Sequence, residues 1–349
     1  MKKNIYFICT DNKEPIGGVK QLYRQVDILN KNGFNAFIVH RKKGFRHKWF
    51  KNETKIIYNL SLYSKIEKIL MKKKLTLYKS LKNFIRSRNE DSIDKNGILV
   101  FPEIYGPRIN ELNIDIDKVI FNQNCYYTFN NNKIKDLSIK NIYNDESFLA
   151  SIVVSEDSKK YLQYIFTESA THRIHLGINT NKFSYDKVSK KKQIAFMPRK
   201  LGHDIVQIVS ILKIRNNLKN WNFIPIDNKT EDEVAKILNE SLIFLSLNHR
   251  EGFGLPPAEA MASGCIVIGY AGQGGKEYFK TDFSFKIDEG NIIQFVDKIE
   301  EVALKLEKED NEIIKMSQYA SDYILNNYNL KKEEESIILT WNKILNNKK

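Results

Sequence analysis

Cysteine is scarce in this chain, with three residues among 349 and no Cys-x-x-Cys pair. Cys9, Cys125 and Cys265 lie far apart in the sequence, which excludes a disulfide framework and a cysteine-rich zinc module. We therefore expect reduced, buried thiols in a cytoplasmic protein, and no metal site.

Long hydrophobic runs are also missing, although 42% of the residues are apolar. No stretch approaches the roughly 18 consecutive apolar residues of a transmembrane helix, so we expect no membrane span. The apolar content nevertheless suffices for sizeable cores, and a chain of this length fits two domains better than one.

Acidic residues are rare at one end of the chain. Residues 1–88 contain 22 Lys and Arg against 5 Asp and Glu, whereas residues 181–349 contain 25 against 24. In the basic end, residues 40–51 interleave cations with aromatic residues, and residues 64–88 read as a cationic amphipathic helix. Such segments suit the surface of an anionic membrane, and no recognisable nucleic-acid module accompanies them. We expect a peripheral position at the inner membrane face and no nucleic acid; a merely solvated lysine-rich face is the alternative.

The order of the predicted elements indicates an α/β fold. Short apolar runs alternate with helical patterns in both halves, as in doubly wound Rossmann-like sheets. Gly177 and Asn179 interrupt regular structure, and we interpret them as the crossing between two domains, residues 1–178 and 179–349. The helix near 330–349 is a candidate for packing back on the first domain.

The most informative segment is residues 250–264, in which two glycines precede two prolines. Glycine lets the backbone approach a ligand closely, and proline is compatible with the first turn of a helix. The helix expected over residues 257–263 would point free N–H groups at the loop, where an anion binds favourably. Glu251 in the loop and Glu259, expected in the first helical turn, place carboxylates on either side of that anion. A phosphate beside carboxylates that accept hydroxyl groups indicates a nucleotide sugar.

The spacing of the two glutamates resembles the E-x7-E motif of retaining glycosyltransferases with the GT-B fold, in particular glycosyltransferase family four. The resemblance implies two Rossmann-like domains facing across a cleft, with the acceptor on the N-terminal domain and the donor on the C-terminal one. It implies that Glu259 binds the ribose hydroxyls and Glu251 the transferred sugar, with Glu277 a weaker candidate near the donor. The loop residues that would face sugar and phosphate are Gly252, Phe253, Gly254 and Leu255.

Arg199 and Lys200 directly follow a predicted strand, so they can pair with the phosphates of a nucleoside diphosphate. The family has an Arg and a Lys at this rim, usually several residues apart. They are adjacent here, so which of the two carries the role stays open. We count both, with Glu251, as candidate catalytic residues that stabilise charge on the departing diphosphate; two solvated cations are the alternative.

Gly17 and Gly18 separate the first predicted strand from its helix. They resemble the family's N-terminal glycine loop, which accepts a phosphate or lets the acceptor approach. The family commonly offers a His after a central strand of this domain. This chain has Asn122, Gln123 and Asn124 at the matching place, so the acceptor-side polar contact stays open.

The resemblance implies a retaining hexosyl- or deoxyhexosyltransferase that moves a sugar from a nucleoside diphosphate sugar to a saccharide or lipid-linked acceptor, in surface polysaccharide or glycoconjugate biosynthesis. It implies no metal and no cofactor, because the leaving diphosphate itself helps to deprotonate the acceptor hydroxyl. One alternative is a GT-B-fold epimerase or hydrolase of nucleotide sugars. Another is a non-catalytic basic protein that binds a membrane or nucleic acid on the same scaffold.

Overall fold

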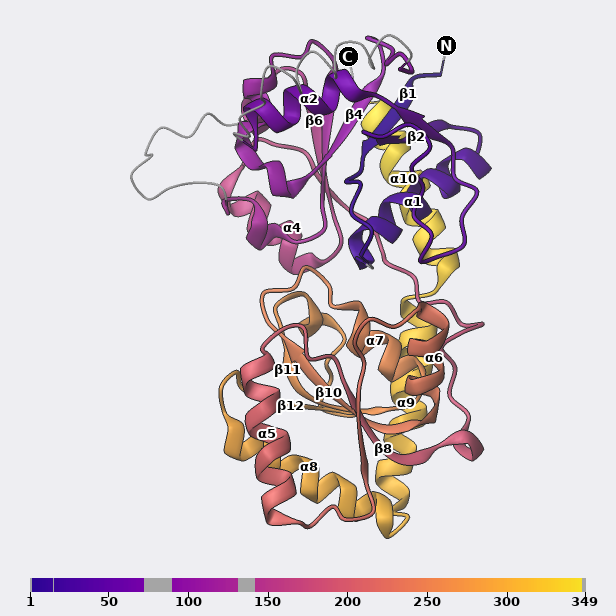
Figure 1. The fold of residues 1–349 in the computed structure, drawn as a ribbon, viewed down its shortest axis with the longest axis vertical. Coiled ribbons are helices and arrows are strands. Elements are labelled where there is room, and N and C mark those ends of the chain that lie inside the picture. The colour runs from indigo at the N-terminus through magenta and orange to yellow at the C-terminus, as the bar shows by residue number, and fades with distance from the viewer. Residues whose placement is uncertain (1, 15, 72–89, 131–141, 347–349) are drawn as a thin grey trace. The chain divides into compact units, whose positions relative to one another are not determined.

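The chain folds into two compact units (Figure 1). The first comprises residues 1–154, 158–174 and 334–349, and the second comprises residues 155–157 and 175–333. The polypeptide therefore leaves the first unit, builds the second, and returns to the first within its last helix. The computed structural model describes residues 2–14, 16–71, 90–130 and 142–346.

The first unit is built on a sheet whose described strands all run parallel. Because parallel strands share one direction, the polar residues that follow them gather at a single edge. The strand order reverses between β1 and β4, which is where ligands bind in such sheets. In spatial order the strands are β3 (Ile56–Tyr58), β2 (Asn35–His40), β1 (Asn4–Ile8), β4 (Ile98–Pro102), β5 (Asp117–Asn122), β6 (Phe148–Val153) and β7 (Thr171–Arg173).

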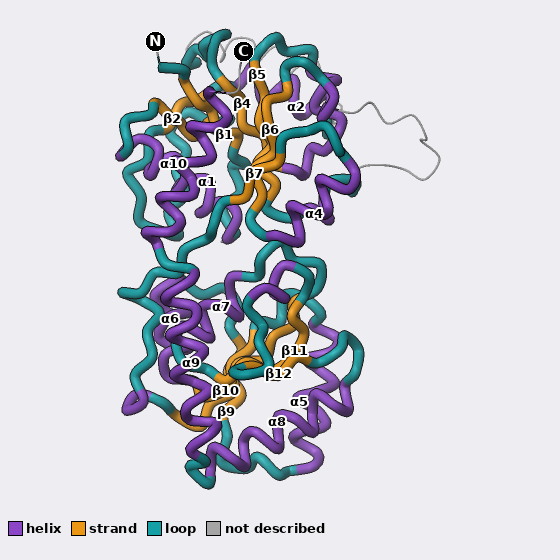
Figure 2. Tube along the Cα trace, turned by 180° about the vertical axis from the view of Figure 1, so that it is seen from behind, coloured by secondary structure: helices purple, strands orange, loops and turns teal. Residues whose placement is uncertain are grey.

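Helices cover both faces of this sheet. Successive strand residues point to opposite faces, so Tyr6 joins one buried cluster, while the ring of Phe7 lies 5.8 Å from that of Trp341. Trp341 belongs to α10 (Leu330–Asn346), which lies next to α1 (Gly17–Lys31) in Figure 2. The cluster containing Tyr6 is closed by α2 (Leu60–Ile69) and α4 (Glu156–Ile165), and the other face by α1 (Gly17–Lys31) and α10 (Leu330–Asn346).

The second unit repeats this plan around a smaller parallel sheet. Its described strands, in spatial order, are β12 (Ser284–Lys286), β11 (Ile266–Ala271), β10 (Ser241–Asn248), β8 (Lys191–Phe196) and β9 (Asn222–Pro225). Apolar residues of two helices, α5 (Gly202–Arg215) and α8 (Ile292–Glu307), form the core on one face. The helices α6 (Glu231–Glu240), α7 (Leu255–Ala262) and α9 (Asn311–Asn327) complete the unit.

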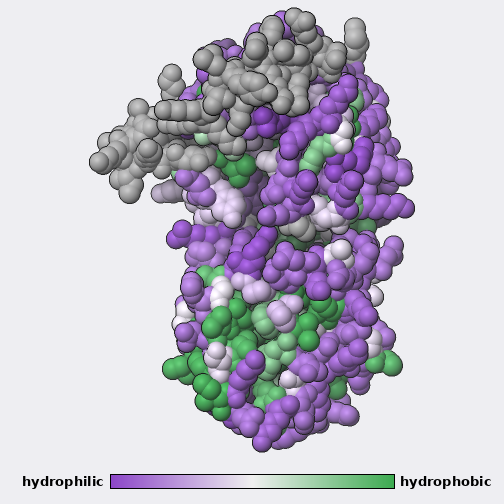
Figure 3. All heavy atoms as spheres, in the orientation of Figure 1, coloured by the Kyte–Doolittle hydropathy of each residue, from purple (hydrophilic) through white to green (hydrophobic). Residues whose placement is uncertain are grey.

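The composition of the surface follows from these layers. Hydrophilic residues dominate the face in Figure 3, and hydrophobic residues reach the surface mainly in the second unit, where Val206 and Ile214 of α5 are exposed. All three cysteines are buried and free. Among the described residues, no helix is both long and apolar enough to cross a membrane.

Candidate active site

Residues that lie far apart in the sequence meet at the carboxyl edge of the second sheet. The Nζ atom of Lys200, after β8, forms an ion pair with Oε1 of Glu251, after β10. Both side chains are partly accessible, at 31% and 22%. The structure therefore brings two of the three candidate catalytic residues into contact, whereas Arg199 is exposed beside them.

The loop that carries Glu251 is held in one conformation by its neighbours. The backbone carbonyl oxygen of Glu251 accepts a hydrogen bond from the N–H of Gly274, at 3.1 Å. A Cβ atom on Gly274 would lie only 2.0 Å from the carbonyl oxygen of Gly252. The loop after β11 therefore supports the loop after β10 so closely that only glycine fits between them.

Gly254 is the last residue before α7 and has a φ of +84°, a conformation that L-residues rarely adopt. A Cβ atom there would also lie 2.2 Å from Nδ2 of Asn248. The hydroxyl of Tyr278 donates to the carbonyl oxygens of Gly254 and, at 3.1 Å, of Phe253. The Phe253 side chain is buried against Tyr278, so only its backbone could face a ligand.

Helix α7 begins at Leu255, two residues before the predicted start, and its first turn contains no acidic residue. The prediction that Glu259 lies in the first turn was therefore wrong, because Pro256 and Pro257 both fit within that turn. Glu259 lies one turn further on and is half-buried. The helix start has no side-chain cap, so its first N–H groups point toward the Glu251 loop without a capping side chain.

Polar groups that we did not predict complete this edge. The hydroxyl of Tyr270, at the end of β11, donates to Oδ2 of Asp204 at 2.8 Å. Burial, first, and this carboxylate raise the pKa of Tyr270 to about 12, so the phenol stays a hydrogen-bond donor. No local sequence pattern predicts that Tyr270, Asn248 or Tyr278 lies at this edge. Asn248 ends β10, Tyr270 lies near the end of β11, and Tyr278 follows the turn Gly274–Glu277.

Glu277 lies at the end of the loop after β11, but its contacts are with other parts of the second unit. Its Oε1 accepts from the hydroxyl of Tyr328 at 3.2 Å, and its Oε2 accepts from the backbone N–H of Glu156 at 3.2 Å. The hydroxyl of Tyr323 donates to its backbone carbonyl at 3.3 Å. These bonds hold the Glu277 carboxylate and account for its position without a ligand.

At the carboxyl edge of the first sheet, Gly17 begins α1 and Gly18 lies against Gln123. Nε2 of Gln123 donates to the carbonyl oxygen of Gly18 at 3.0 Å. Asn124 instead caps a short turn, accepting from the N–H of Tyr126 at 3.1 Å. Of the three residues that replace the expected His, Asn122 is buried and its Oδ1 has no hydrogen-bond partner.

Sequence reasoning missed Glu103, which follows β4 at this same edge and is 4% exposed. Its Oε1 accepts from the backbone N–H of Asn124 at 3.0 Å. Burial raises the pKa of Glu103 to about 7, against hydrogen bonds from backbone N–H groups that favour the ionised form. A single carboxyl after an apolar strand gives no sequence signal of burial, because glutamate is normally exposed.

The aromatic residues of the basic segment 40–51 were expected to contact a membrane surface, but they pack largely against each other and His47. Phe45, Trp49 and Phe50 are half-buried, and their ring centroids lie 5.0, 6.4 and 6.3 Å from that of His47. These rings pack inside the first unit, and the cations Lys42, Lys43, Lys48 and Lys51 are exposed. Most of the cationic helix expected over residues 64–88 lies outside the described residues.

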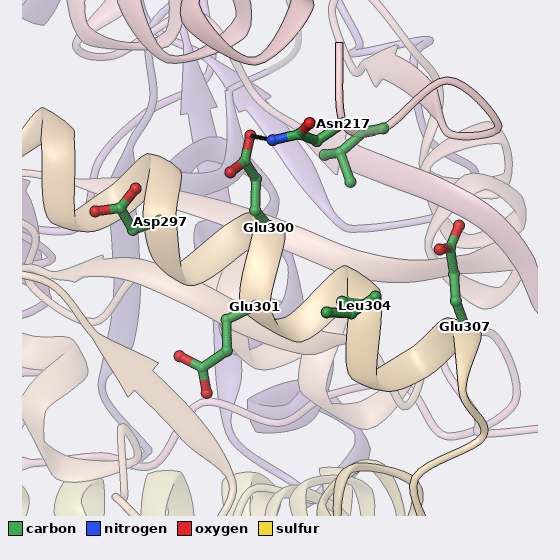
Figure 4. Close-up of a pocket in the computed structure, with 7 residues that line it drawn as sticks. Asn217, Asp297, Glu300, Glu301, Leu304 and Glu307 are labelled. Carbon is green, nitrogen blue, oxygen red and sulfur yellow. Dashed lines mark hydrogen bonds between the residues drawn. The ribbon is translucent and has the colours of Figure 1, made fainter. Parts of the chain in front are cut away.

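A hollow of about 470 Å³ occurs elsewhere on the second unit, along α8 (Figure 4). Four acidic side chains line it, and Nδ2 of Asn217 donates to Oε1 of Glu300 at 3.1 Å. Carboxylates would repel an anionic ligand, so this hollow does not suit the phosphates that the sequence predicts at the strand ends.

Comparison with known proteins identifies the fold and the second unit. Residues 207–320 match the family model of the glycosyl transferases group 1. Within the second unit, the chain is thus similar to the group 1 glycosyl transferases over these residues. An alpha-1,6-glucosyltransferase of Actinobacillus pleuropneumoniae serotype 7 (strain AP76) is 36% identical over 157 residues, which cover 44% of this chain and 46% of that protein. The chain thus spans less than half the length of the curated relatives it matches.

The likeness of folds extends beyond residues 207–320 to nearly the whole chain. Sucrose-phosphate synthase from Thermosynechococcus elongatus superposes with a TM-score of 0.69 at 12% identity, covering 99% of this chain and 100% of that one. A TarM variant of S. aureus, in complex with Fondaparinux, alpha-GlcNAc-glycerol and UDP, gives 0.66 at 13% identity, covering 99% and 100%. The chain has the GT-B fold, which confirms the predicted fold class.

Proposed function

We propose that this chain is a retaining glycosyltransferase that transfers a hexosyl or deoxyhexosyl group from a nucleoside diphosphate sugar to a saccharide or lipid-linked acceptor. The observation that carries the proposal is the arrangement of Glu251, Lys200 and the uncapped start of α7 at one edge of a group 1 glycosyl transferase domain. Support for the donor class comes from TarM, whose structure holds UDP. Support for sugar transfer comes from the glucosyltransferase relative.

In this proposal the protein supplies binding, positioning and charge stabilisation. The N–H groups of α7 and the cations Arg199 and Lys200 bind the diphosphate and stabilise its charge as the glycosidic bond breaks. Glu251 accepts hydroxyl groups of the sugar, and Glu259 those of the ribose. The bond between C1 of the sugar and the diphosphate oxygen breaks, and the acceptor oxygen bonds to C1 on the same face. The departing diphosphate takes the proton of the acceptor hydroxyl, and no metal ion takes part.

A donor screen tests the proposal. Incubation of the protein with UDP, GDP, dTDP and ADP sugars should raise its melting temperature with one donor class, since a ligand that binds only the folded state stabilises it. Product analysis with saccharide acceptors should then show retention at the anomeric carbon. Turnover of the donor without any acceptor would instead indicate an epimerase or hydrolase.

Matched variants locate the donor site. Glu259→Gln and Lys200→Met should each weaken donor affinity about ten-fold or more, because each removes a charged hydrogen-bond partner. Lys276→Met removes an exposed cation of the loop after β11 and is the control. Equal losses in the Lys276 and Lys200 variants, or none in either site variant, would contradict the assignment.

We also propose that the exposed lysines of residues 42–51 hold the protein at the anionic inner face of the membrane, in surface polysaccharide or glycoconjugate biosynthesis. Each cation near such a surface contributes about 1 kcal/mol. Sedimentation with anionic liposomes should recover the protein at low salt and release it at high salt. Neutral liposomes are the control, and binding that salt does not change would refute the electrostatic attachment.

A further inference from the structure

Three metal-ligating side chains meet in the interior of the first unit, away from the glycosyl transferase domain. Cys9 follows β1, His40 ends β2, and His47 lies in the segment that follows β2. They are 1%, 0% and 2% exposed. One ligand atom from each lies within 4.8 Å of the others. Because β1 and β2 pair in register up to Ile8 and Val39, the next residue on each strand is brought to the same place.

The spacing of these atoms suits a tetrahedral metal ion. Sγ of Cys9 and Nε2 of His47 are 4.0 Å apart. A zinc ion with ordinary bond lengths holds a sulfur and a nitrogen about 3.6 Å apart. A movement of less than an ångström therefore brings both atoms to bonding distance.

His40 is already oriented as a metal ligand. Its Nδ1 lies 2.9 Å from Oδ1 of Asp11, and a carboxylate can only accept, so Nδ1 carries the proton. The Asp11 carboxylate is itself fixed by the backbone N–H groups of Arg41 and Lys42, at 3.2 and 3.0 Å. Nε2 therefore carries the lone pair, which accepts from the hydroxyl of Tyr23 at 2.7 Å and which a metal ion would take over. A carboxylate behind a histidine in this way is the usual arrangement that orients a metal-binding imidazole.

A metal ion at this place would replace two hydrogen bonds. Nε2 of His47 lies 3.2 Å from the carbonyl oxygen of Thr10, to which it donates without a metal; metal binding at Nε2 moves that proton to Nδ1, which is buried and has no other partner. The hydroxyl of Tyr23 would give up its bond to Nε2 of His40 and is the nearest oxygen for the fourth ligand position. The rings of Phe45, Trp49 and Phe50 surround His47 and exclude water, which strengthens metal–ligand bonds.

We propose that Cys9, His40 and His47 bind one zinc ion, which fixes residues 41–51 on the carboxyl edge of the first sheet. Nitrogen and sulfur ligands favour zinc over magnesium or calcium, which prefer oxygen. Binding converts the Cys9 thiol to a zinc thiolate and releases its proton to solvent. The role is structural, and it is compatible with metal-independent sugar transfer in the other unit.

Metal titration of the full chain tests this site. After removal of metals with a chelator, the protein should bind one equivalent of Co²⁺ with a thiolate-to-metal absorption band, and Zn²⁺ should displace it. Cys9→Ala and His47→Ala should abolish the band and the rise in melting temperature that Zn²⁺ causes. Cys125→Ala, which removes another buried thiol of the same unit, should keep both.

A milder variant covers the case in which Cys9→Ala fails to fold. Asp11→Asn keeps all three ligands and removes only the carboxylate behind His40, so zinc affinity should fall about 10- to 100-fold. Cobalt binding without a thiolate band, or unchanged affinity in the Asp11 and His47 variants, would overturn the proposal. Failure of the chelated protein to bind either metal would also overturn it, and would mean that His40 and His47 are ordinary packed core residues.

Discussion

Two glutamates of this chain, Glu251 and Glu103, differ sharply in their exposure to solvent and in their hydrogen-bond partners. Glu251 is partly accessible and paired with Lys200, so its oxygens can be reached by a ligand. Glu103 is enclosed, with its carboxylate turned onto backbone N–H groups after β5. The first is suited to ligand contact, and the second positions Gln123 and Asn124 at the edge of the first sheet.

Glu103 predicts a pH dependence of stability. Its folded-state pKa of about 7 lies above the ordinary value because burial disfavours the charge. Its contribution to stability is therefore complete below about pH 4 and is lost as the pH rises through 7, by roughly 3 kcal/mol. Glu103→Gln should flatten this part of the curve of unfolding free energy against pH, measured by chemical denaturation.

The exposed Glu53 gives the matching control for this experiment. Glu53→Gln should leave the shape of the curve unchanged. If Glu103→Gln and wild type lose equal stability between pH 4 and 7, the buried carboxyl does not set the dependence.

Among the elements, the loops at the second sheet are more constrained than the helices they join. A Cβ atom on Gly254 would overlap the Asn248 side chain, and one on Gly274 would overlap the backbone of Gly252. A Cβ atom on Gly202, at the start of α5, would have no atom within 4 Å. This edge of the second sheet is thus a pair of closely packed turns, in which Asn248 and Tyr278 hold the backbone from which α7 begins.

Gly254→Ala should lower the free energy of unfolding by about 2 kcal/mol or more, because it adds a left-handed backbone penalty to a clash with Asn248. Gly202→Ala should change it by less than about 1 kcal/mol, since nothing lies within 4 Å of the added atom. Denaturant titration of both variants checks the difference. Equal effects would show that the Gly254 turn tolerates a side chain.

The strands and the glycine–proline loop could be predicted because their signals are local. The run 241–248 is mostly apolar and nearly all buried, and the glycines and prolines of 250–264 lie together in the sequence. The start of α7 was misplaced because proline fits several positions of a first turn. The Lys200–Glu251 pair, 51 residues apart, and the burial of Glu103 depend on tertiary packing, which a local pattern does not encode.

At the scale of the whole molecule, the chain is not divided into two consecutive halves. Residues from Glu334 onward belong to the first unit. Trp341 of α10 is fully buried, with its ring 5.8 Å from that of Phe7. The last helix is therefore part of the core that the first strand begins.

Trp341→Ala should destabilise the first unit by about 3–5 kcal/mol, the usual cost of removing a buried tryptophan ring. Hydrogen exchange should speed up in β1 and β4 and stay unchanged in β8 and β10, because those strands belong to the other unit. Leu339→Ala on the same helix, where Leu339 is 57% exposed, should change neither. Faster exchange in both sheets would mean that the units unfold together.

The return of α10 to the first unit sets the order in which the units can be completed during protein synthesis. The ribosome makes the strands of the first sheet early, but the helix that covers Phe7 is made only after residues 175–333. Because domains fold as units while the chain emerges, the second unit can finish folding while the first still exposes an apolar face. The part of the molecule made first thus cannot be completed until the last helix has been made.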